Sequence, residues 1–178
     1  SEKDPLRGDH PYEVSKSATD LIATTYFKTY GIPVAITRFG NVYGEGDLNF
    51  SRIIPGIMQA VIKKETLQIR SDGTFVRDYI YVKDVVNAYL LLMSKIEKIK
   101  GEAFNLSSSQ SYSVLEVIAI ISKILNKKIS YTIINSQKNE APYQSLNYEK
   151  ATRALGYKAH YKLNQVIKKI YQWYKRIL

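Results

Sequence analysis

Segments with helical spacing alternate with short β-branched runs along most of the chain, and this alternation limits the fold more than any other feature. Over residues 12–30, apolar side chains recur every three or four positions, as on one face of a helix. Gly31 and Pro33 then stop that helix, and residues 34–39 have the length and composition of a buried strand. Because alternating helices and strands are typical of parallel sheets, we expect an α/β fold.

The alternation continues through the rest of the chain. Further strands are expected at residues 67–70, 78–82, 103–106 and 129–134. Further helices are expected from Pro55, from Asp84, from the capping box Ser113–Glu116, before Gly156 and over residues 163–177. No domain boundary is evident, and the strands are few for so many helices. We therefore expect these 178 residues to be a piece of a larger protein.

Residue composition excludes several kinds of site. The sequence contains no cysteine, which rules out disulfide bonds and thiolate zinc sites, and we expect no metal site. The lack of cysteine also suits a reducing compartment, so we expect a cytoplasmic protein. No apolar run approaches the ~20 residues that a membrane helix needs. Residues 1–10 are too polar for a secretory signal, and we expect no membrane partner.

The net charge of +10, from 26 Lys and Arg against 16 Asp and Glu, allows two interpretations. One is a nucleic-acid partner, and the other is a lysine-rich surface together with a site for an anionic small molecule. The lysines are scattered along the sequence, without a dense basic arm or a known nucleic-acid-binding motif. We therefore favour the small anion and expect no nucleic-acid partner.

Tyr12 and Lys16 lie four residues apart at the start of the first helix, so their side chains project from one face about one turn apart. An ammonium group near a tyrosine hydroxyl favours the phenolate, which makes the tyrosine a usable proton donor and acceptor. The chain has 15 tyrosines, however, and the spacing taken alone favours a solvated Tyr–Lys pair.

A series of ordered motifs surrounds this pair and extends over nearly the whole chain. The motifs are PYEVSK at residues 11–16, VAITRFGNVYG at 34–44, RIIP at 52–55, GTFVRDYIYVKDV at 73–85, AFNL at 103–106 and the segment from Lys150 to Tyr157. Together they resemble the extended short-chain dehydrogenase/reductase family, and within it the NAD-dependent nucleotide-sugar epimerases and dehydratases. Residues 44–55 are most similar to dehydratases of the CDP-glucose 4,6-dehydratase type.

The resemblance implies the C-terminal part of a Rossmann-type parallel sheet plus a small α/β substrate-binding subdomain. Residues 1–178 would lack the N-terminal dinucleotide-binding half, because no glycine-rich phosphate loop stands between a strand and a helix. At full length, the resemblance implies a homodimeric, NAD-dependent enzyme of polysaccharide biosynthesis that acts on a nucleotide-diphosphate sugar. We expect these 178 residues to be inactive in isolation.

The reaction that the resemblance favours is 4,6-dehydration of an NDP-glucose, of the CDP-glucose kind, through a 4-keto intermediate. One alternative is 4-epimerisation of an NDP-sugar. Another is a non-catalytic sugar-nucleotide-binding module, if this chain is the natural product. We expect the residues that decide between dehydration and epimerisation to lie mostly outside residues 1–178.

The resemblance also implies roles for individual residues. Tyr12 matches the catalytic tyrosine that removes the sugar hydroxyl proton during hydride transfer to NAD. Lys16 matches the lysine that holds the nicotinamide ribose, so both residues are expected at the catalytic and cofactor sites. Phe39 falls where the family packs a side chain near the nicotinamide, and a core aromatic at a strand end is an equal alternative.

Four further residues are implied in substrate binding. Asn41 matches the asparagine that approaches the substrate diphosphate, with a turn asparagine as the alternative. Arg52 and Ile53 fall in the segment that lines the nucleotide site. Arg77 matches the arginine that binds the diphosphate bidentately, with a surface arginine paired to a nearby aspartate as the alternative. Many relatives carry another arginine before the penultimate helix, but residues 139–145 contain none.

Overall fold

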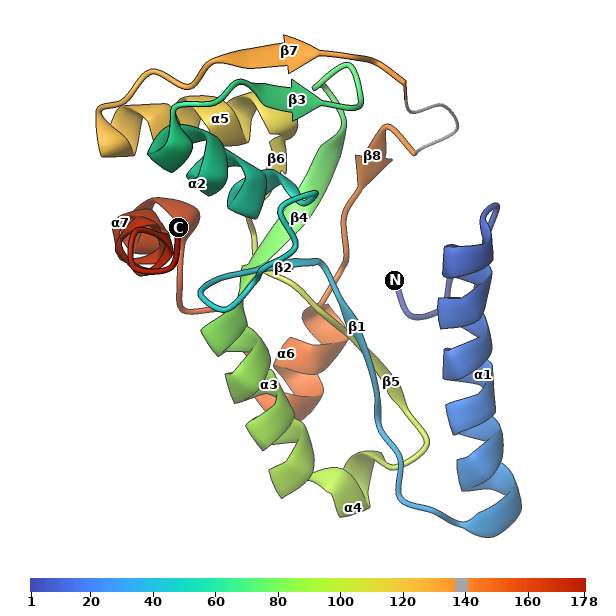
Figure 1. Cartoon of the computed structure of the whole chain (residues 1–178). Helices are drawn as coiled ribbons and strands as arrows, with labels where there is room; N and C mark the ends of the chain where they lie inside the picture. The colour runs from blue at the N-terminus through green and yellow to red at the C-terminus, as the bar shows by residue number, and fades with distance from the viewer. Residues whose placement is uncertain (137–140) are drawn as a thin grey trace. The chain divides into compact units, whose positions relative to one another are not determined.

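The computed structural model describes residues 1–136 and 141–178, which fold into two compact units (Figure 1). Unit 1 consists of Ser1–Phe39, Val85–Ser107 and Leu146–Lys158, and unit 2 consists of Gly40–Asp84, Ser108–Ser145 and Ala159–Leu178. Each unit is therefore assembled from three separate stretches of chain. The sequence does not indicate this division, because no linker of distinct composition marks the points where the chain changes unit.

Unit 1 is built on two parallel strands. β1 (Ile36–Phe39) pairs with β5 (Ala103–Leu106) along its whole length, from Ile36 opposite Ala103 to Phe39 opposite Leu106. The helices of this unit are α1 (Pro11–Tyr30), α3 (Val82–Ser94) from Val85 onward, α4 (Ile96–Ile99) and α6 (Glu149–Leu155). Parallel pairing of strands that are separated by helices confirms the predicted α/β fold.

Helix α1 begins and ends where the sequence predicts. Pro11 takes a first-turn position, where the missing proline N–H costs nothing. Gly31 ends the helix in a left-handed conformation (φ 69°) and donates its N–H to the Phe27 carbonyl at 2.9 Å. The Phe27 ring lies against Gly101, where an added Cβ would come within 2.2 Å of a ring carbon. A side chain at position 101 would therefore displace α1.

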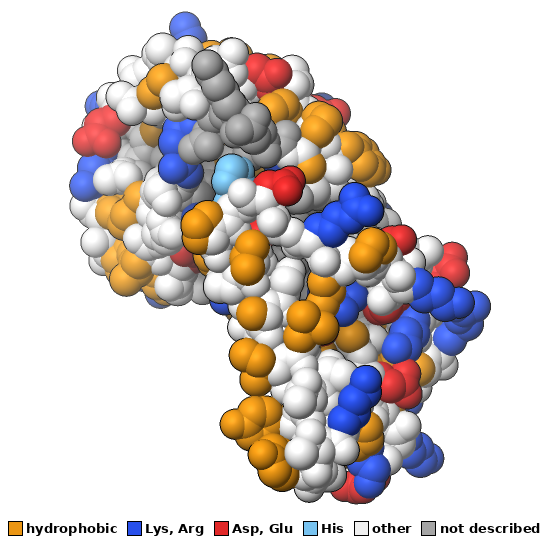
Figure 2. All heavy atoms as spheres, turned by 90° about the vertical axis from the view of Figure 1, so that its right-hand side faces the viewer, with side chains coloured by type: hydrophobic (Ala, Val, Ile, Leu, Met, Phe, Trp, Pro, Cys, Tyr) orange, Lys and Arg blue, Asp and Glu red, His pale blue; other side chains and the backbone are white. Residues whose placement is uncertain are grey.

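Within unit 1, α1 is held by specific contacts more than by a broad apolar face. Its buried residue is Asp20, whose carboxylate accepts a 2.7 Å hydrogen bond from Nε of Arg38 in β1. Leu21 and Ile22 are 59% and 57% exposed, and hydrophobic side chains are visible on the face that carries α1 (Figure 2). Despite this exposed apolar area, no helix in the described residues is long and apolar enough to cross a membrane.

Unit 2 contains the remaining elements. Its strands are β2 (Asn41–Tyr43), β3 (Leu67–Ile69), β4 (Val76–Tyr81), β6 (Ser111–Ser113), β7 (Tyr131–Ile133) and β8 (Tyr143–Gln144). Its helices are α2 (Ile53–Lys63), α5 (Val114–Leu125) and α7 (Leu163–Tyr174). β4 pairs in parallel with β2 and β8 and antiparallel with β6, while β3 pairs in parallel with β7.

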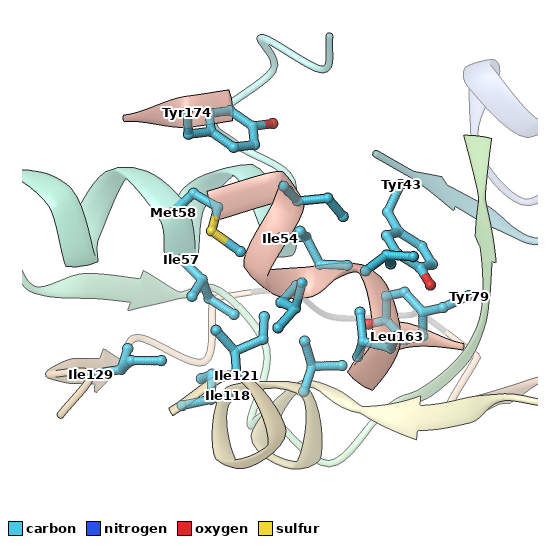
Figure 3. Close-up of a cluster of buried hydrophobic side chains, with 14 of the residues drawn as sticks. Tyr43, Ile54, Ile57, Met58, Tyr79, Ile118, Ile121, Ile129, Leu163 and Tyr174 are labelled. Carbon is cyan, nitrogen blue, oxygen red and sulfur yellow. The ribbon is translucent and has the colours of Figure 1, made fainter. Parts of the chain in front are cut away.

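The core of unit 2 is formed where its three helices meet. Ile54, Ile57 and Met58 of α2 pack in one cluster with Ile118 and Ile121 of α5 and with Leu163 and Tyr174 of α7 (Figure 3). Burial of each such side chain stabilises the fold by roughly 1.5–3 kcal/mol relative to its exposure. This packing holds α2 in place and with it the N-terminal end of that helix.

Short elements account for most differences between the sequence prediction and the structure. The strand at 103–106 is confirmed, as is the capping box, in which the Ser113 N–H donates to the Glu116 carboxylate at 2.7 Å. The helices predicted from Pro55 and Asp84 begin two residues earlier, at Ile53 and Val82. β2, β6 and β8 are not predicted, because strands of two or three residues carry no readable alternation.

Candidate functional site

A cavity of about 550 Å³ lies in unit 2 beside the N-terminal end of α2. Its walls come from β2, the loop before α2, α2 itself, β3 and β4. Asn41, Arg52, Ile53 and Arg77, the four residues predicted to bind substrate, all line it. The structure thus brings these side chains together from separate segments, while their role in binding stays a prediction.

Strand pairing brings Asn41 and Arg77 to this cavity. Asn41 begins β2 and lies opposite Tyr79 of β4. Arg77 precedes Tyr79 by two positions in β4, so the Arg77 and Tyr79 side chains lie on the same face of that strand. Asn41, Arg77 and Tyr79 all line the cavity. The parallel β2–β4 pair therefore presents an amide and a guanidinium to the same space.

Arg52 fixes the loop that precedes α2. Its Nη1 lies 2.9 Å from Oδ2 of Asp47, and its Nη2 donates to the Val42 carbonyl at 2.6 Å. Arg52 is also the N-cap residue of α2, but its side chain makes no capping hydrogen bond to the helix. Its guanidinium therefore connects β2, the loop and the helix, and its charge is matched by Asp47.

Arg77 is half-buried in the cavity wall. Its Nη1 donates to the Val76 carbonyl at 2.8 Å, and its guanidinium carbon lies 5.7 Å from the centre of the Phe75 ring. In the sequence, Asp84 is one of the nearby aspartates that could pair with Arg77 at the surface. In the structure the Asp84 carboxylate is fully buried and accepts two backbone N–H groups from the segment before α7.

Arg70 also lines this cavity, although it is not among the site residues predicted from the sequence. It directly follows β3, and its Nη2 donates to the Ser51 carbonyl at 3.2 Å. The feature of the sequence that could have identified Arg70 is a charged residue directly after a strand. Of the arginine-free stretch 139–145, residues 139 and 140 lie outside the described part of the chain.

Tyr43 also lines the cavity and is almost wholly buried. Within the described residues, its hydroxyl has no hydrogen-bond partner. Burial, with a smaller contribution from the Asp84 carboxylate, raises the pKa of Tyr43 well above its ordinary value.

Tyr12 and Lys16 lie together in unit 1, as their spacing predicts. The Lys16 Nζ lies 5.3 Å from the centre of the Tyr12 ring, near the N-terminal end of α1. The Tyr12 side chain is 72% exposed within the chain as described. Ser15 Oγ donates to the Tyr12 carbonyl at 2.6 Å and so ties down the first turn that carries the pair.

Phe39 makes the packing contact that its strand-end position suggests. Its ring centre lies 5.4 Å from that of Tyr89 in α3, with the two rings tilted by 54°. Phe39 is only partly buried, so this contact leaves both interpretations of its role open. Proximity to a nicotinamide ring remains a prediction for Phe39.

Glu45 anchors the other end of the loop before α2. Its carboxylate accepts a 2.6 Å hydrogen bond from the Tyr81 hydroxyl and lies 3.1 Å from Nζ of Lys169 in α7. Burial favours a higher pKa for Glu45, but the bonds from Tyr81 and Lys169 outweigh it and hold the pKa below its ordinary value. Burial and the bond to Glu45 raise the pKa of Tyr81 to about 12.

Residues 1–107 match the NAD dependent epimerase/dehydratase family, and the chain belongs to this family. The chain is 27% identical to the dTDP-glucose 4,6-dehydratase of Haemophilus influenzae, over 98% of this chain and 54% of that protein. The dTDP-glucose 4,6-dehydratase of Bacillus anthracis, solved in complex with NAD, is 28% identical. It superposes with a TM-score of 0.87 over 99% of this chain and 55% of that one.

A UDP-glucuronic acid 4-epimerase from Bacillus cereus has the same fold. Its TM-score is 0.89 at 23% identity, over the whole of this chain and 59% of that one. The chain therefore spans little more than half the length of these three relatives. The likeness confirms that the fold corresponds to part of an epimerase/dehydratase structure.

The ion pair at Glu45 leads to a prediction about pH and stability. Because the folded-state pKa of Glu45 is depressed, its carboxylate stabilises the fold above the pKa of an unfolded glutamate, about 4.3. That contribution is lost as pH falls through the folded-state pKa. Glu45→Gln should therefore lower the free energy of unfolding near neutral pH, and its difference from wild type should shrink in acid. Urea denaturation at a series of pH values measures this difference.

Glu97→Gln is the matched control, because Glu97 forms an exposed pair with Lys100 at 3.1 Å. Such surface pairs contribute about 0–1 kcal/mol. A gap between wild type and Glu45→Gln that stays constant with pH would contradict the assignment.

Proposed function

We propose that unit 2 forms the nucleotide-sugar-binding part of an NAD-dependent nucleotide-sugar dehydratase or epimerase, whose catalytic Tyr–Lys pair lies on α1. The observation that carries this proposal is the single cavity lined by Asn41, Arg52, Ile53 and Arg77. The names of the relatives supply the substrate class, a sugar linked to a nucleoside diphosphate.

The end of the cavity at α2 suits a diphosphate. The first N–H groups of a helix lack partners inside the helix and favour negative charge, and α2 has no side-chain cap there. Arg77 can offer two parallel N–H donors to phosphate oxygens, and the Asn41 amide can offer another. Arg52 holds the loop against β2, so these donors are in place before a ligand arrives.

The Tyr12–Lys16 pair suits proton transfer from a sugar hydroxyl. In this proposal the Tyr12 hydroxyl is the group that exchanges a proton with the 4-hydroxyl of the sugar, and Lys16 Nζ lies 5.3 Å from the centre of the Tyr12 ring. Bound NAD would take up the hydride and later return it. The Lys16 ammonium fits a ribose hydroxyl, but the sequence supplies no glycine-rich turn for the NAD pyrophosphate.

The proposed reaction is 4,6-dehydration of an NDP-glucose through a 4-keto intermediate. The dehydratases from Haemophilus influenzae and Bacillus anthracis are named for dTDP-glucose, whereas residues 44–55 favour the CDP-glucose kind, so the base is left open. 4-Epimerisation is the alternative reaction. A second candidate function, if this chain is the natural product, is a non-catalytic nucleotide-sugar-binding module.

Tyr12→Phe tests the catalytic part of the proposal. In a protein that joins this chain to a dinucleotide-binding half, the change should lower kcat by roughly 10²–10⁴-fold or more. Nucleotide-sugar affinity should stay nearly unchanged, because only the proton-transferring hydroxyl is removed. Steady-state kinetics and calorimetric titration measure the two quantities.

Tyr30→Phe is the matched control, because Tyr30 is a similarly exposed tyrosine of α1 (69%) at the other end of the helix. It should leave both quantities unchanged. An unaltered kcat in Tyr12→Phe would show that Tyr12 is a surface residue without a catalytic role.

Arg77→Ala tests the diphosphate site. The change should weaken binding of CDP- or dTDP-glucose by about an order of magnitude or more, because charge-assisted bidentate bonds are lost. The melting temperature should move far less, and Arg153→Ala, an exposed arginine of α6, should change neither. If affinity holds while the melting temperature falls, Arg77 is structural and the substrate site lies elsewhere.

A further inference from the structure

We propose that Arg70 is a second diphosphate-binding cation of this cavity, acting beside Arg77. This inference rests on the proposed function, because it assumes that the cavity receives a nucleotide sugar. It assigns a role to a residue that the family motifs in the sequence do not single out, since Arg70 lies just before the GTFVRDYIYVKDV motif.

The position of Arg70 is fixed at the same helix end as the predicted diphosphate donors. Its Nη2 donates to the carbonyl of Ser51 at 3.2 Å, and Ser51 immediately precedes Arg52, the N-cap residue of α2. Ser51, Arg52 and Ile53 all line the cavity together with Arg70. The Arg70 guanidinium therefore lies where the unpaired N–H groups of α2 also begin.

Arg70 makes no ion pair with a carboxylate of the described residues, so its charge is available to an anion. Among the described residues, the carboxylates that line the cavity are Asp47 and Glu65. Asp47 is matched by Arg52 at 2.9 Å. Glu65 follows the C-terminal end of α2, and an 11-residue helix is about 16 Å long, so this carboxylate lies far from the N-terminal end.

Arg70 also differs from Arg52 in what its guanidinium contacts. The Arg70 guanidinium donates to a neutral carbonyl oxygen, whereas Arg52 binds a carboxylate. A carbonyl contact orients the guanidinium without cancelling its charge. The side chain is exposed rather than buried, so donors remain accessible to a ligand.

In this proposal Arg70 takes the place of the arginine that many relatives carry before the penultimate helix and that residues 139–145 lack. A diphosphate has negative charge on both phosphates, so a second guanidinium adds further charge-assisted hydrogen bonds. In this chain the second guanidinium would come from the end of β3 instead.

The test compares Arg70→Ala and Arg70→Lys with wild type in the 178-residue chain. Calorimetric titration is carried out with two probes, dTDP-glucose and inorganic pyrophosphate, the second of which has no base or sugar. Arg70→Ala should weaken both by about tenfold, and Arg70→Lys, which keeps the charge but loses the planar fork, should weaken both by less. Arg176→Ala removes the same charge from unit 2 outside the cavity and should change neither.

Each other outcome overturns part of the argument in a distinct way. If dTDP-glucose binding weakens while pyrophosphate binding does not, Arg70 contacts the base or the sugars and the inference is wrong. If Arg70→Ala and Arg70→Lys behave like Arg176→Ala, the inference is wrong and the proposed function stands. If wild type binds neither probe, the proposed function itself fails. Melting temperatures equal to wild type show that the variants are folded.

Discussion

The guanidinium of Arg52 joins the three segments that form the cavity. Through its bonds to the Asp47 carboxylate and the Val42 carbonyl, it connects the loop before α2 to the end of β2. The Tyr174 hydroxyl of α7 donates to the Asp47 carbonyl, so the same loop is also tied to the helical core. An exposed ion pair adds only about 0–1 kcal/mol, so stability comes from the packed helices and Arg52 contributes position.

Packing fixes the N-terminal end of α2 at the cavity wall. Ile54, Ile57 and Met58 commit α2 to the core with α5 and α7. The helix cannot shift without losing that burial, and its uncapped first turn remains at the cavity wall. The proposed anion site depends on this helix geometry and on the arginines around it.

Features set by local sequence could be predicted, and features set by tertiary pairing could not. Helix α1 with its Gly31 end and the capping box of α5 follow from neighbouring residues alone. β2 has only three residues and forms because it pairs with β4, so no alternating apolar pattern in the sequence predicts it. The division into two units could not be predicted from the sequence either, because it depends on which distant segments pack together.

The candidate site shows the same limit. Family motifs in the sequence pointed to Asn41, Arg52, Ile53 and Arg77, and the fold places all four around one cavity. Arg70 lies outside the motifs, and only the hydrogen bond to Ser51 connects it with the end of α2. Tyr12 and Lys16 were predicted to meet because one helical turn separates them, and they do.

The most direct test of the central claim is an amide NMR titration of the 178-residue chain with dTDP-glucose. Binding of the diphosphate at the end of α2 predicts concentration-dependent shifts at the backbone amides of Asn41, Ile53 and Arg77. The amides of Lys127 and Lys128, which line a separate cavity of about 280 Å³, should stay in place. Shifts confined to Lys127 and Lys128, or none at millimolar ligand, would contradict a nucleotide-sugar site at the N-terminal end of α2.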